Sequence, residues 1–383
     1  PGPNSYTGED CAEIHCHGSP VVLDEVLAAA FARGARQARG GEFTQRAFLS
    51  GRMDLIQAES VADLIDAESA GAARNAVGQL QGRMSRSVGG IYDALMDVVS
   101  RFYAIVDYPD EEIEPLQQAQ IEQTLAESAE RLDALLATFS RGRLLKSGVP
   151  AVILGKPNAG KSSLLNALLG YDRAIVTDIA GTTRDTVEEK VLVGSVLLRL
   201  CDTAGIRDAA DTVERLGVER AQQAAQRAEL ALLVLDGSAP LTREDEEAIA
   251  AARRARRMLV LVNKADLPQV LDTAALRVRF GEVIPLSARS GTGVDALCRA
   301  VEELFAGGET PRGELLTNAR QAESAQRALD AVRRAEQALR IGLSPDAVLT
   351  DAEEALEALA EFSGKRVRDD LVATIFSRFC VGK

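Results

Sequence analysis

Apolar residues recur along the chain with two different spacings, which predict two kinds of structure. One helical face is marked by Ile121, Leu125, Leu132, Leu135, Leu136 and Phe139, and another by Ala58, Val61, Leu64 and Ile65. Residues three, four or seven positions apart lie on one side of a helix. Between residues 149 and 286 the apolar residues instead form short, almost continuous runs, at 149–154, 197–201, 230–235, 258–262 and 283–286. Such runs are typical of buried strands in a mostly parallel sheet.

The order of these patterns predicts the domain organisation. Residues 1–50 are mixed, with a helix-like stretch at 21–33, and residues 51–147 are mostly helical. An α/β segment occupies 148–308, and helical periodicity resumes within 309–383, after a linker with Gly307-Gly308, Pro311 and Gly313. We expect one helical domain into which an α/β domain is inserted, because the ends of a compact domain often lie close together. Two separate helical appendages are the alternative.

Residues 155–162, Gly-Lys-Pro-Asn-Ala-Gly-Lys-Ser, match the phosphate-binding pattern G-x-x-x-x-G-K-[ST]. The match lies between a predicted strand and a helix that we expect to end at Gly170, which is the context the pattern requires. Backbone N–H groups of such a loop cradle phosphates, the lysine neutralises their oxygens and the serine hydroxyl binds Mg²⁺. The predicted phosphate and Mg²⁺ site comprises Asn158, Ala159, Gly160, Lys161, Ser162 and Ser163.

Four further motifs complete a guanine-nucleotide domain. Thr182-Thr183 provide a switch threonine for Mg²⁺, assigned to Thr183, and Asp202-Thr203-Ala204-Gly205 follow an apolar run, with Asp202 serving the Mg²⁺ shell. Asn263-Lys264-Ala265-Asp266 follow the apolar run at 258–262. Asp266 can accept hydrogen bonds from guanine N1 and N2, a donor pair that adenine lacks. Ser287-Ala288-Arg289 suit the guanine O6. Together the motifs predict a GTPase.

Charge and cysteine content narrow the function classes. The net charge of −13 argues against tight, sequence-blind nucleic-acid binding through a broad basic face, but allows a local RNA contact or a basic partner that holds the RNA. No apolar run reaches the roughly 20 residues of a membrane span, and no signal peptide is visible. Five cysteines occur without a C-x-x-C pair, which favours reduced thiols over a disulfide framework or a zinc site. We expect a cytoplasmic protein with no membrane partner.

A cluster of cysteine and histidine near the start of the chain could be mistaken for a metal site. His15 and His17 lie close to Cys11 and Cys16. The alternation over residues 12–17 looks like a strand, and the two faces of a strand would separate these side chains. We therefore expect no metal there.

Several stretches resemble the bacterial GTPases that modify tRNA at the wobble uridine, the MnmE or TrmE family, and the resemblance covers essentially the whole chain. They are Gly-Pro-Asn-Ser-Tyr-Thr-Gly-Glu-Asp at 2–10, Gly-Glu-Phe-Thr-Gln-Arg-Ala-Phe-Leu at 41–49, Asp54-Leu55 with Ala58-Glu59, Asp-Tyr-Pro-Asp-Glu-Glu at 107–112, the GTPase motifs, and Phe-Cys-Val-Gly-Lys at 379–383. The resemblance implies a P-loop GTPase domain with a doubly wound sheet, inserted into a helical domain. Part of an α+β folate-binding and dimerisation domain, at 1–50, precedes them. We expect the chain to lack the first part of that domain, including a folate-contacting arginine.

The resemblance also implies a reaction and its partners. With a flavoprotein of the MnmG or GidA type, which carries FAD, the family adds an aminomethyl or carboxymethylaminomethyl group to C5 of the wobble uridine. The carbon comes from a tetrahydrofolate derivative, 5,10-methylene or 5-formyl, and GTP is hydrolysed. We therefore expect a homodimer that forms a heterotetramer with the flavoprotein. Implied folate ligands are Glu13, Arg52, where the family usually has lysine, and Lys383. An exposed Glu13 and a solvated Arg52 are the plain alternatives.

Hydrolysis requires a group that orients the attacking water. Many GTPases use a glutamine after D-x-x-G, but Ile206 stands there. Glu214 matches the family's catalytic glutamate, although by itself it reads as a helix-face carboxylate. Arg184 and Arg207 are candidates for an arginine that stabilises charge, and both also fit a solvated role.

A K⁺ ion supplies the missing charge in the family when two G domains meet. The resemblance carries its ligands over to Asn158, the backbone carbonyls of Thr177 and Ile179, and Thr182. The implied nucleotide-binding loop consists of Thr177, Asp178, Ile179, Ala180, Gly181, Thr182 and Thr183.

Cys380 near the C-terminus has two interpretations. A thiol beside a pyrimidine can attack C6 and so activate C5, with Lys383 as the nearby cation, or it can be a small packing residue between Phe379 and Val381.

Two other functions also fit a GTPase. A ribosome-assembly GTPase would need a basic appendage that the acidic flanks lack, and a GTP-gated interaction switch would not need the folate-domain signature.

Overall fold

The computed structural model describes residues 1–107, 115–171, 189–201, 214–305, 313–365, 375–376 and 379. The chain folds into two compact units. The first consists of Pro1–Ala67, Ala72–Gly142 and Thr310–Lys383, and the second of Glu68–Gly71 and Arg143–Glu309. The multidomain α/β and all-α fold class predicted from the sequence is confirmed.

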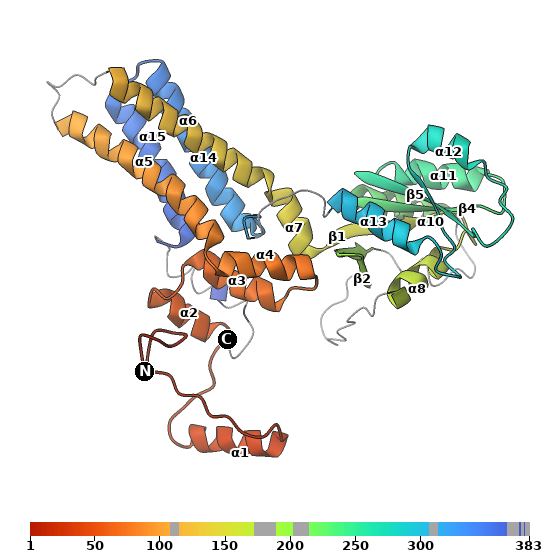
Figure 1. Cartoon of the computed structure of the whole chain (residues 1–383), viewed down its shortest axis with the longest axis horizontal. Coiled ribbons are helices and arrows are strands. Elements are labelled where there is room, and N and C mark those ends of the chain that lie inside the picture. The colour runs from red at the N-terminus through yellow and green to blue at the C-terminus, as the bar shows by residue number, and fades with distance from the viewer. Residues whose placement is uncertain are drawn as a thin grey trace. The chain divides into compact units, whose positions relative to one another are not determined.

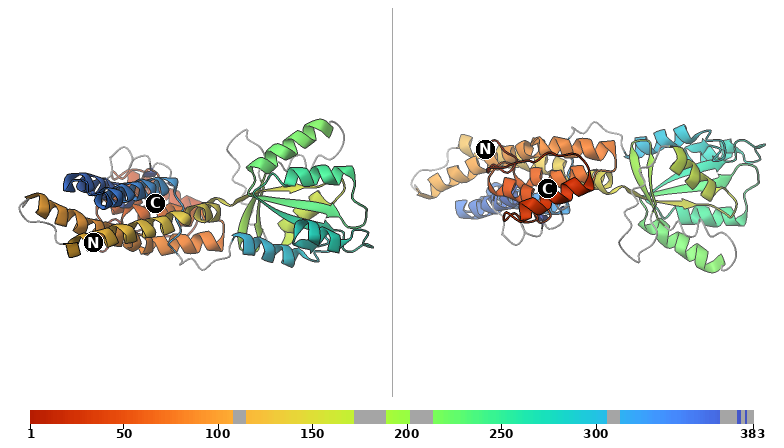
Figure 2. Two further views of the ribbon diagram at one scale, coloured as in Figure 1. Left: turned by 90° about the horizontal axis from the view of Figure 1, so that it is seen from above. Right: turned by 90° about the horizontal axis from the view of Figure 1, so that it is seen from below.

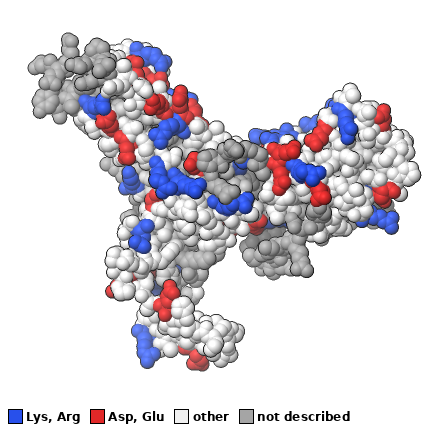
Figure 3. Space-filling view, in the orientation of Figure 1, with Lys and Arg blue, Asp and Glu red and all other residues white. Residues whose placement is uncertain are grey.

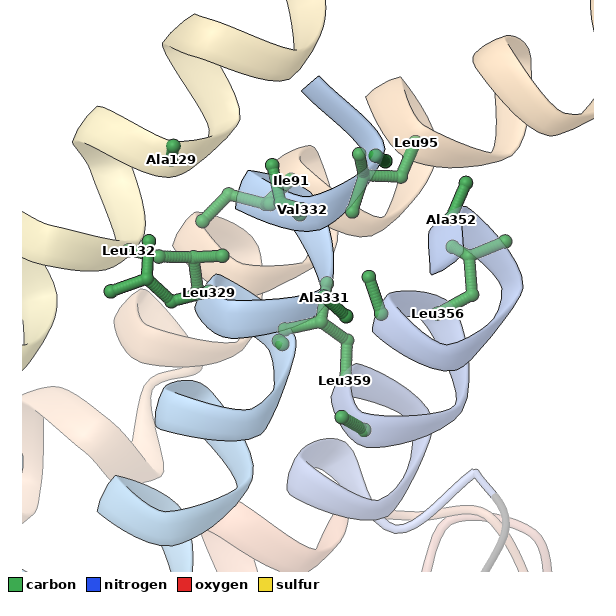
Figure 4. Packing of buried hydrophobic residues seen from close by; sticks show 14 of the residues in the cluster. Ile91, Leu95, Ala129, Leu132, Leu329, Ala331, Val332, Ala352, Leu356 and Leu359 are labelled. Atoms are coloured by element: carbon green, nitrogen blue, oxygen red, sulfur yellow. The ribbon is translucent and has the colours of Figure 1, made fainter. Parts of the chain in front are cut away.

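Four long helices of the first unit lie side by side in Figure 1, and they come from both sides of the α/β segment. They are α5 (Arg83–Asp107), α6 (Pro115–Ala137), α14 (Ala319–Arg340) and α15 (Pro345–Ser363). Their buried faces form one hydrophobic core, part of which is shown in Figure 4. Alanines at 325, 328, 331, 335 and 338 line the buried face of α14, and such small side chains let neighbouring helices approach closely. The bundle therefore depends on helices separated by almost two hundred residues of chain.

Shorter helices adjoin the bundle within the first unit. They are α2 (Glu42–Leu49), α3 (Leu55–Ile65) and α4 (Ala70–Leu80). The helix α7 (Phe139–Ser147) begins in the first unit and ends in the second, just before the first strand. Asp54 begins α3 through a capping box with Gln57, in which each side chain bonds the other residue's backbone N–H. Phe376 and Phe379 pack against Ala58 of α3, so the last described residues of the chain rest on a helix from its beginning.

The first forty residues differ from the sequence prediction. Residues 12–17, expected as a strand, form neither strand nor helix, and all side chains from Cys11 to Pro20 are exposed. A strand needs a partner strand for its backbone hydrogen bonds, and no described residue supplies one. The helix α1 (Pro20–Phe31) forms as its periodicity predicted, but it has no buried residue, and Val21, Leu27 and Phe31 are exposed.

The second unit is built on a six-stranded sheet with the strand order β2-β3-β1-β4-β5-β6. The strands are β1 (Val149–Leu154), β2 (Glu189–Val193), β3 (Val196–Leu200), β4 (Leu230–Asp236), β5 (Arg257–Asn263) and β6 (Val283–Pro285). All neighbouring pairs are parallel except β2 with β3. After β1 the chain builds β2 and β3 on one side of this strand, and then β4, β5 and β6 on its other side. The strand order therefore reverses at β1, and doubly wound sheets bind ligands at the carboxyl ends of the strands where this happens.

Helices cover both faces of this sheet, as the views in Figure 2 show. One face packs against α8 (Lys161–Tyr171) and α13 (Val294–Phe305), and the other against α10 (Glu214–Arg227), α11 (Arg243–Ala252) and α12 (Thr273–Phe280). The sequence prediction that the first of these helices ends at Gly170 is wrong, because α8 continues to Tyr171. Gly170 therefore lies within the helix, although a helical glycine costs roughly 1 kcal/mol relative to alanine.

The surface and the helices also bear on the function classes. On the face of the molecule seen in Figure 3, the Lys and Arg side chains are interspersed with Asp and Glu rather than gathered in one area. Within the described part of the chain, no helix is both long enough and apolar enough to cross a membrane.

Candidate functional site

The loop between β1 and α8 has a backbone that only certain residues can adopt. Gly155 and Gly160 have φ values of 155° and 102°, and Asn158 has φ 62°, in the left-handed region that asparagine tolerates better than most residues. A Cβ at Gly155 would lie 2.4 Å from the Val234 carbonyl oxygen, and one at Gly160 would lie 2.1 Å from Asn263 Nδ2. The loop therefore passes directly against the ends of β4 and β5, and its glycines make that approach possible.

Lys161, the first residue of α8, lies folded back over this loop. Its Nζ donates to the carbonyl oxygens of Gly155 (2.9 Å) and Lys156 (2.8 Å), and burial lowers the pKa of its ammonium group. The Ser162 and Ser163 side chains are exposed on the first turn of the helix. A partly buried cation above a glycine loop, beside the N–H groups of a helix start, is an arrangement that attracts phosphate.

A second loop, after β5, holds the residues expected to read the base. The Asp266 carboxylate is exposed, and its Oδ1 accepts a hydrogen bond from Ser287 Oγ at 2.7 Å. This bond lowers the pKa of Asp266, with its own backbone N–H adding to the effect. Asp266 is therefore ionised at neutral pH and can accept hydrogen bonds from two donors on one edge of a base.

Asn263 connects the two loops and is itself buried. Its Nδ2 donates to the Ala159 carbonyl oxygen in the phosphate loop, and its Oδ1 accepts from the Ala288 N–H, both at 2.9 Å. The sequence placed Asn263, Ala288 and the exposed Arg289 in a nucleotide site without revealing this bridge. The N-K-x-D pattern was the only signal for it. The structure thus brings together Asn158 to Ser163, Asn263 to Asp266 and Ser287 to Arg289 at the carboxyl edge of the sheet.

The remaining predicted site residues are placed only in part. Glu214 is the first residue of α10, but its side chain lies outside what the structure describes. Also outside the described residues lie Thr177, Asp178, Ile179, Ala180, Gly181, Thr182, Thr183, Arg184, Asp202, Thr203, Ala204, Gly205, Ile206, Arg207, Cys380 and Lys383.

The donors that are described suit hard cations. Mg²⁺ and K⁺ take oxygen ligands, and the loop offers the Ser162 hydroxyl for the first and the exposed Asn158 amide for the second. Asn158 has a left-handed backbone conformation within this loop. The described residues are compatible with both ions.

Two of the three expected folate ligands, Glu13 and Arg52, are described; they lie in the first unit, and both are exposed. Glu13 Oε2 lies 3.2 Å from His15 Nε2, and the Arg52 side chain runs beside Gly8, where an added Cβ would approach Arg52 Cγ to 3.0 Å. Among the described residues, no hydrogen bond or ion pair joins Glu13 to Arg52. A carboxylate and a guanidinium can pair with pterin N–H and carbonyl groups, so the donor types fit this ligand.

Comparison with known proteins gives the same family from two directions. The family model for the MnmE helical domain matches residues 55–380, and the model for the N-terminus of the GTP-binding protein TrmE matches residues 1–52. Proteins named tRNA modification GTPase MnmE from Roseiflexus sp. (strain RS-1) and Chromobacterium violaceum are each 45% identical to this chain. Each alignment covers 100% of this chain and 84% of the relative. The protein of that name from Lactiplantibacillus plantarum is 41% identical over 100% of this chain and 83% of its own length.

Solved structures resemble a smaller part of the chain. The G domain of the T. maritima FeoB iron transporter is 22% identical over 42% of this chain and 99% of its own, with a TM-score of 0.31. Translation elongation factor SelB from Methanococcus maripaludis, solved with a GTP analogue, is 19% identical over 43% of this chain and 35% of its own, with a TM-score of 0.32.

Proposed function

The chain belongs to the tRNA modification GTPase MnmE family, and we propose that it is a K⁺-dependent GTPase that modifies C5 of the wobble uridine together with a flavoprotein partner. Its general activity follows from the family: it hydrolyses GTP in tRNA modification. The proposal adds the cation, the chemical group and the partner. The observation that carries the nucleotide assignment is the Asn263 bridge, which joins a phosphate loop to a base-reading loop at one edge of the sheet.

Each described residue of the site has a role in binding GTP. Lys161 exchanges its two carbonyl contacts for phosphate oxygens, which a cation binds more strongly than neutral carbonyls. Asp266 accepts the N1 and N2 protons of guanine while Ser287 holds one of its oxygens. Adenine would leave this carboxylate unpaired, and for that reason ATP is rejected.

Hydrolysis in this proposal depends on Glu214 and a cation. Glu214 orients the attacking water, since Ile206 has no polar group for the task. Ser162, Thr183 and Asp202 serve Mg²⁺, and Asn158, Thr177, Ile179 and Thr182 hold K⁺ between two G domains. When bound, K⁺ supplies positive charge near the transferred phosphoryl group, in place of an arginine.

The modification itself is assigned to the first unit. Glu13, Arg52 and Lys383 hold a tetrahydrofolate derivative that supplies the carbon, and FAD is carried by the flavoprotein. Cys380 acts at the uridine and not at the GTP site. Phe379 packs with Phe376 on Ala58, and this packing supports the proposal because it anchors the residue that precedes Cys380.

The rate of GTP hydrolysis in K⁺ and in Na⁺ at equal ionic strength tests the cation. We expect faster turnover in K⁺, and we expect Asn158→Ala to remove most of that difference. Equal rates of the unmodified chain in the two salts would show that K⁺ has no role.

Replacing Cys380 by serine tests the modification centre. We expect loss of modified uridine in a reaction with tRNA, a folate donor and the flavoprotein, with GTP hydrolysis unchanged. Wild-type levels of modified uridine, or loss of both activities with a lowered melting temperature, would leave Cys380 as a packing residue.

A further inference from the structure

Residues 236–245, from the last residue of β4 to the first turn of α11, contact both nucleotide loops through acidic side chains. Asp236 ends β4 and pairs with Lys264 of the base loop, and Asp245 on the first turn of α11 pairs with Lys156 of the phosphate loop. We propose that Asp236 and Asp245 are positioning residues of the nucleotide site, each holding one of its two loops. This inference rests on the proposed assignment of those loops to GTP.

Asp245 takes part in the helix cap of α11, and its side chain is also almost completely buried. Its side chain is 1% exposed, and Lys156 is 11% exposed. Asp245 Oδ2 accepts from Lys156 Nζ at 2.7 Å and from the N–H and Oγ1 of Thr242, each at 2.8 Å. Its second oxygen, Oδ1, is buried and has no hydrogen-bond partner among the residues that the structure describes. A buried carboxylate with one unpaired oxygen is costly unless a cation compensates it, so Lys156 is held firmly at this position.

The position of Lys156 matters because its backbone belongs to the phosphate loop. The Lys156 carbonyl oxygen is one of the two acceptors for Lys161 Nζ. The ion pair with Asp245 therefore fixes the residue on which the phosphate-binding lysine rests. Loosening the pair would disturb the loop for any nucleotide, because the phosphates are common to all of them.

Asp236 has the equivalent place at the base loop. Its Oδ2 accepts from Lys264 Nζ at 2.5 Å, and its Oδ1 accepts from the N–H and Oγ of Ser238 at 3.0 and 2.6 Å. Burial raises the pKa of Asp236, but the hydrogen bonds from Lys264 and Ser238 together lower it by more than burial raises it. The net shift of the pKa is therefore downward, and the carboxylate is ionised at neutral pH.

Backbone bonds join the same two segments. The Gly237 N–H donates to the Asn263 carbonyl oxygen at 3.0 Å, and the Gly237 carbonyl oxygen accepts from the Val270 N–H at 2.8 Å. Lys264 has φ 63°, a left-handed conformation that is uncommon for lysine. An ion pair at the tip of the side chain helps to hold this conformation, and Asp266, which reads guanine, lies only two residues further on.

Binding of GDP and IDP to the full chain separates the two roles. IDP lacks the guanine N2 amino group, so the ratio of its Kd to that of GDP measures base reading alone. We expect Asp245→Asn and Lys156→Met to raise both Kd values by about tenfold and leave the ratio unchanged, because each removes a charged hydrogen bond at the phosphate side. Lys156→Arg, which keeps the charge, should restore most of the affinity.

Asp236→Asn should act differently, by reducing the ratio of the two Kd values severalfold, since a loosened base loop loses guanine selectivity first. Asp272→Ala is the matched control. Asp272 caps α12 by accepting from the Ala274 and Ala275 N–H groups, and within the described part of the chain no hydrogen bond or ion pair joins its side chain to either nucleotide loop, so its loss should leave both Kd values unchanged.

The inference is wrong if Lys156→Met and Asp245→Asn bind both nucleotides like the wild type, or if Asp236→Asn keeps the wild-type ratio. Equal losses in all four variants, the Asp272 control included, would reduce both aspartates to general structural residues. A wild-type chain that binds neither nucleotide would instead refute the proposed function. Lys156→Met leaves the capping box intact, so the phosphate side is tested even if Asp245→Asn fails to fold.

Discussion

Replacing Glu59 by alanine should destabilise the helical unit strongly, because Glu59 lies at the centre of a buried polar network between α3 and α14. Its two carboxylate oxygens accept from Arg320 Nε and Nη2, both at 3.0 Å, and Oε2 also accepts from Gln321 Nε2 at 2.7 Å. The side chain of Glu59 is 7% exposed and that of Arg320 is 18% exposed. The substitution leaves a largely buried guanidinium without its counter-ion and the buried Gln321 amide without its acceptor.

The expected cost follows from what remains after the change. Breaking a buried ion pair by removing one partner costs about 3–5 kcal/mol. Arg320 keeps two carbonyl acceptors at the end of α15, Glu361 at 2.8 Å and Phe362 at 3.2 Å, so we expect the lower end of that range. For a unit of this size, about 3 kcal/mol corresponds to a fall in Tm of roughly 6–12 °C.

Thermal unfolding followed by far-UV circular dichroism measures this effect, since the chain has no tryptophan to report by fluorescence. GDP should raise only the transition of the α/β unit, which identifies the other transition as that of the helical unit. Asp133→Ala is the control, because it removes an ion pair with Arg333 in which both side chains are about half exposed. Such a pair contributes at most about 1 kcal/mol. If Glu59→Ala lowers the Tm no more than Asp133→Ala, the network does not hold the unit together.

Two further substitutions test the nucleotide site. Gly160→Ala should lower GTP affinity by on the order of 100-fold, because its Cβ would lie 2.1 Å from Asn263 Nδ2 and its φ of 102° is strained for alanine. In Gly281→Ala, whose glycine also has positive φ but no neighbour within 4 Å, affinity should be retained; a titration with a fluorescent nucleotide that finds equal losses would contradict the clash. Glu214→Ala should reduce kcat by about 100-fold or more with GTP affinity nearly intact, since a water-orienting group acts mainly in the transition state. Single-turnover hydrolysis at wild-type speed, or a parallel loss of affinity, would remove Glu214 from the mechanism.

The sequence predicted those parts of the molecule that local patterns determine. The apolar runs at 149–154, 230–235 and 258–262 all became buried strands, and the phosphate pattern fell between β1 and α8 as its context required. The strand predicted at residues 12–17 is wrong, because alternation produces a strand only where a partner strand exists, and no partner strand is described there.

Features that depend on distant contacts could not be predicted. Asp245 reads in sequence as an ordinary helix-capping residue, and Glu59 as one more carboxylate on a helix. Their partners, Lys156 and Arg320, lie 89 and 261 positions away, and only folding brings them within hydrogen-bond distance. The same holds for the Asn263 bridge to Ala159, which links loops 104 positions apart.

Base recognition by Asp266 is the most direct test of the account, since guanine selectivity is what the base loop adds to a phosphate loop. The measurement is the Kd of GTP and of XTP for the wild-type chain and for Asp266→Asn. Xanthine carries a carbonyl where guanine has its N2 amino group, so the asparagine amide can donate to it while its oxygen accepts from N1. We predict that the substitution weakens GTP binding by about 100-fold and strengthens XTP binding by a similar factor. Undiminished GTP affinity in Asp266→Asn, with no gain for XTP, would contradict the assignment of this edge of the sheet as a guanine site.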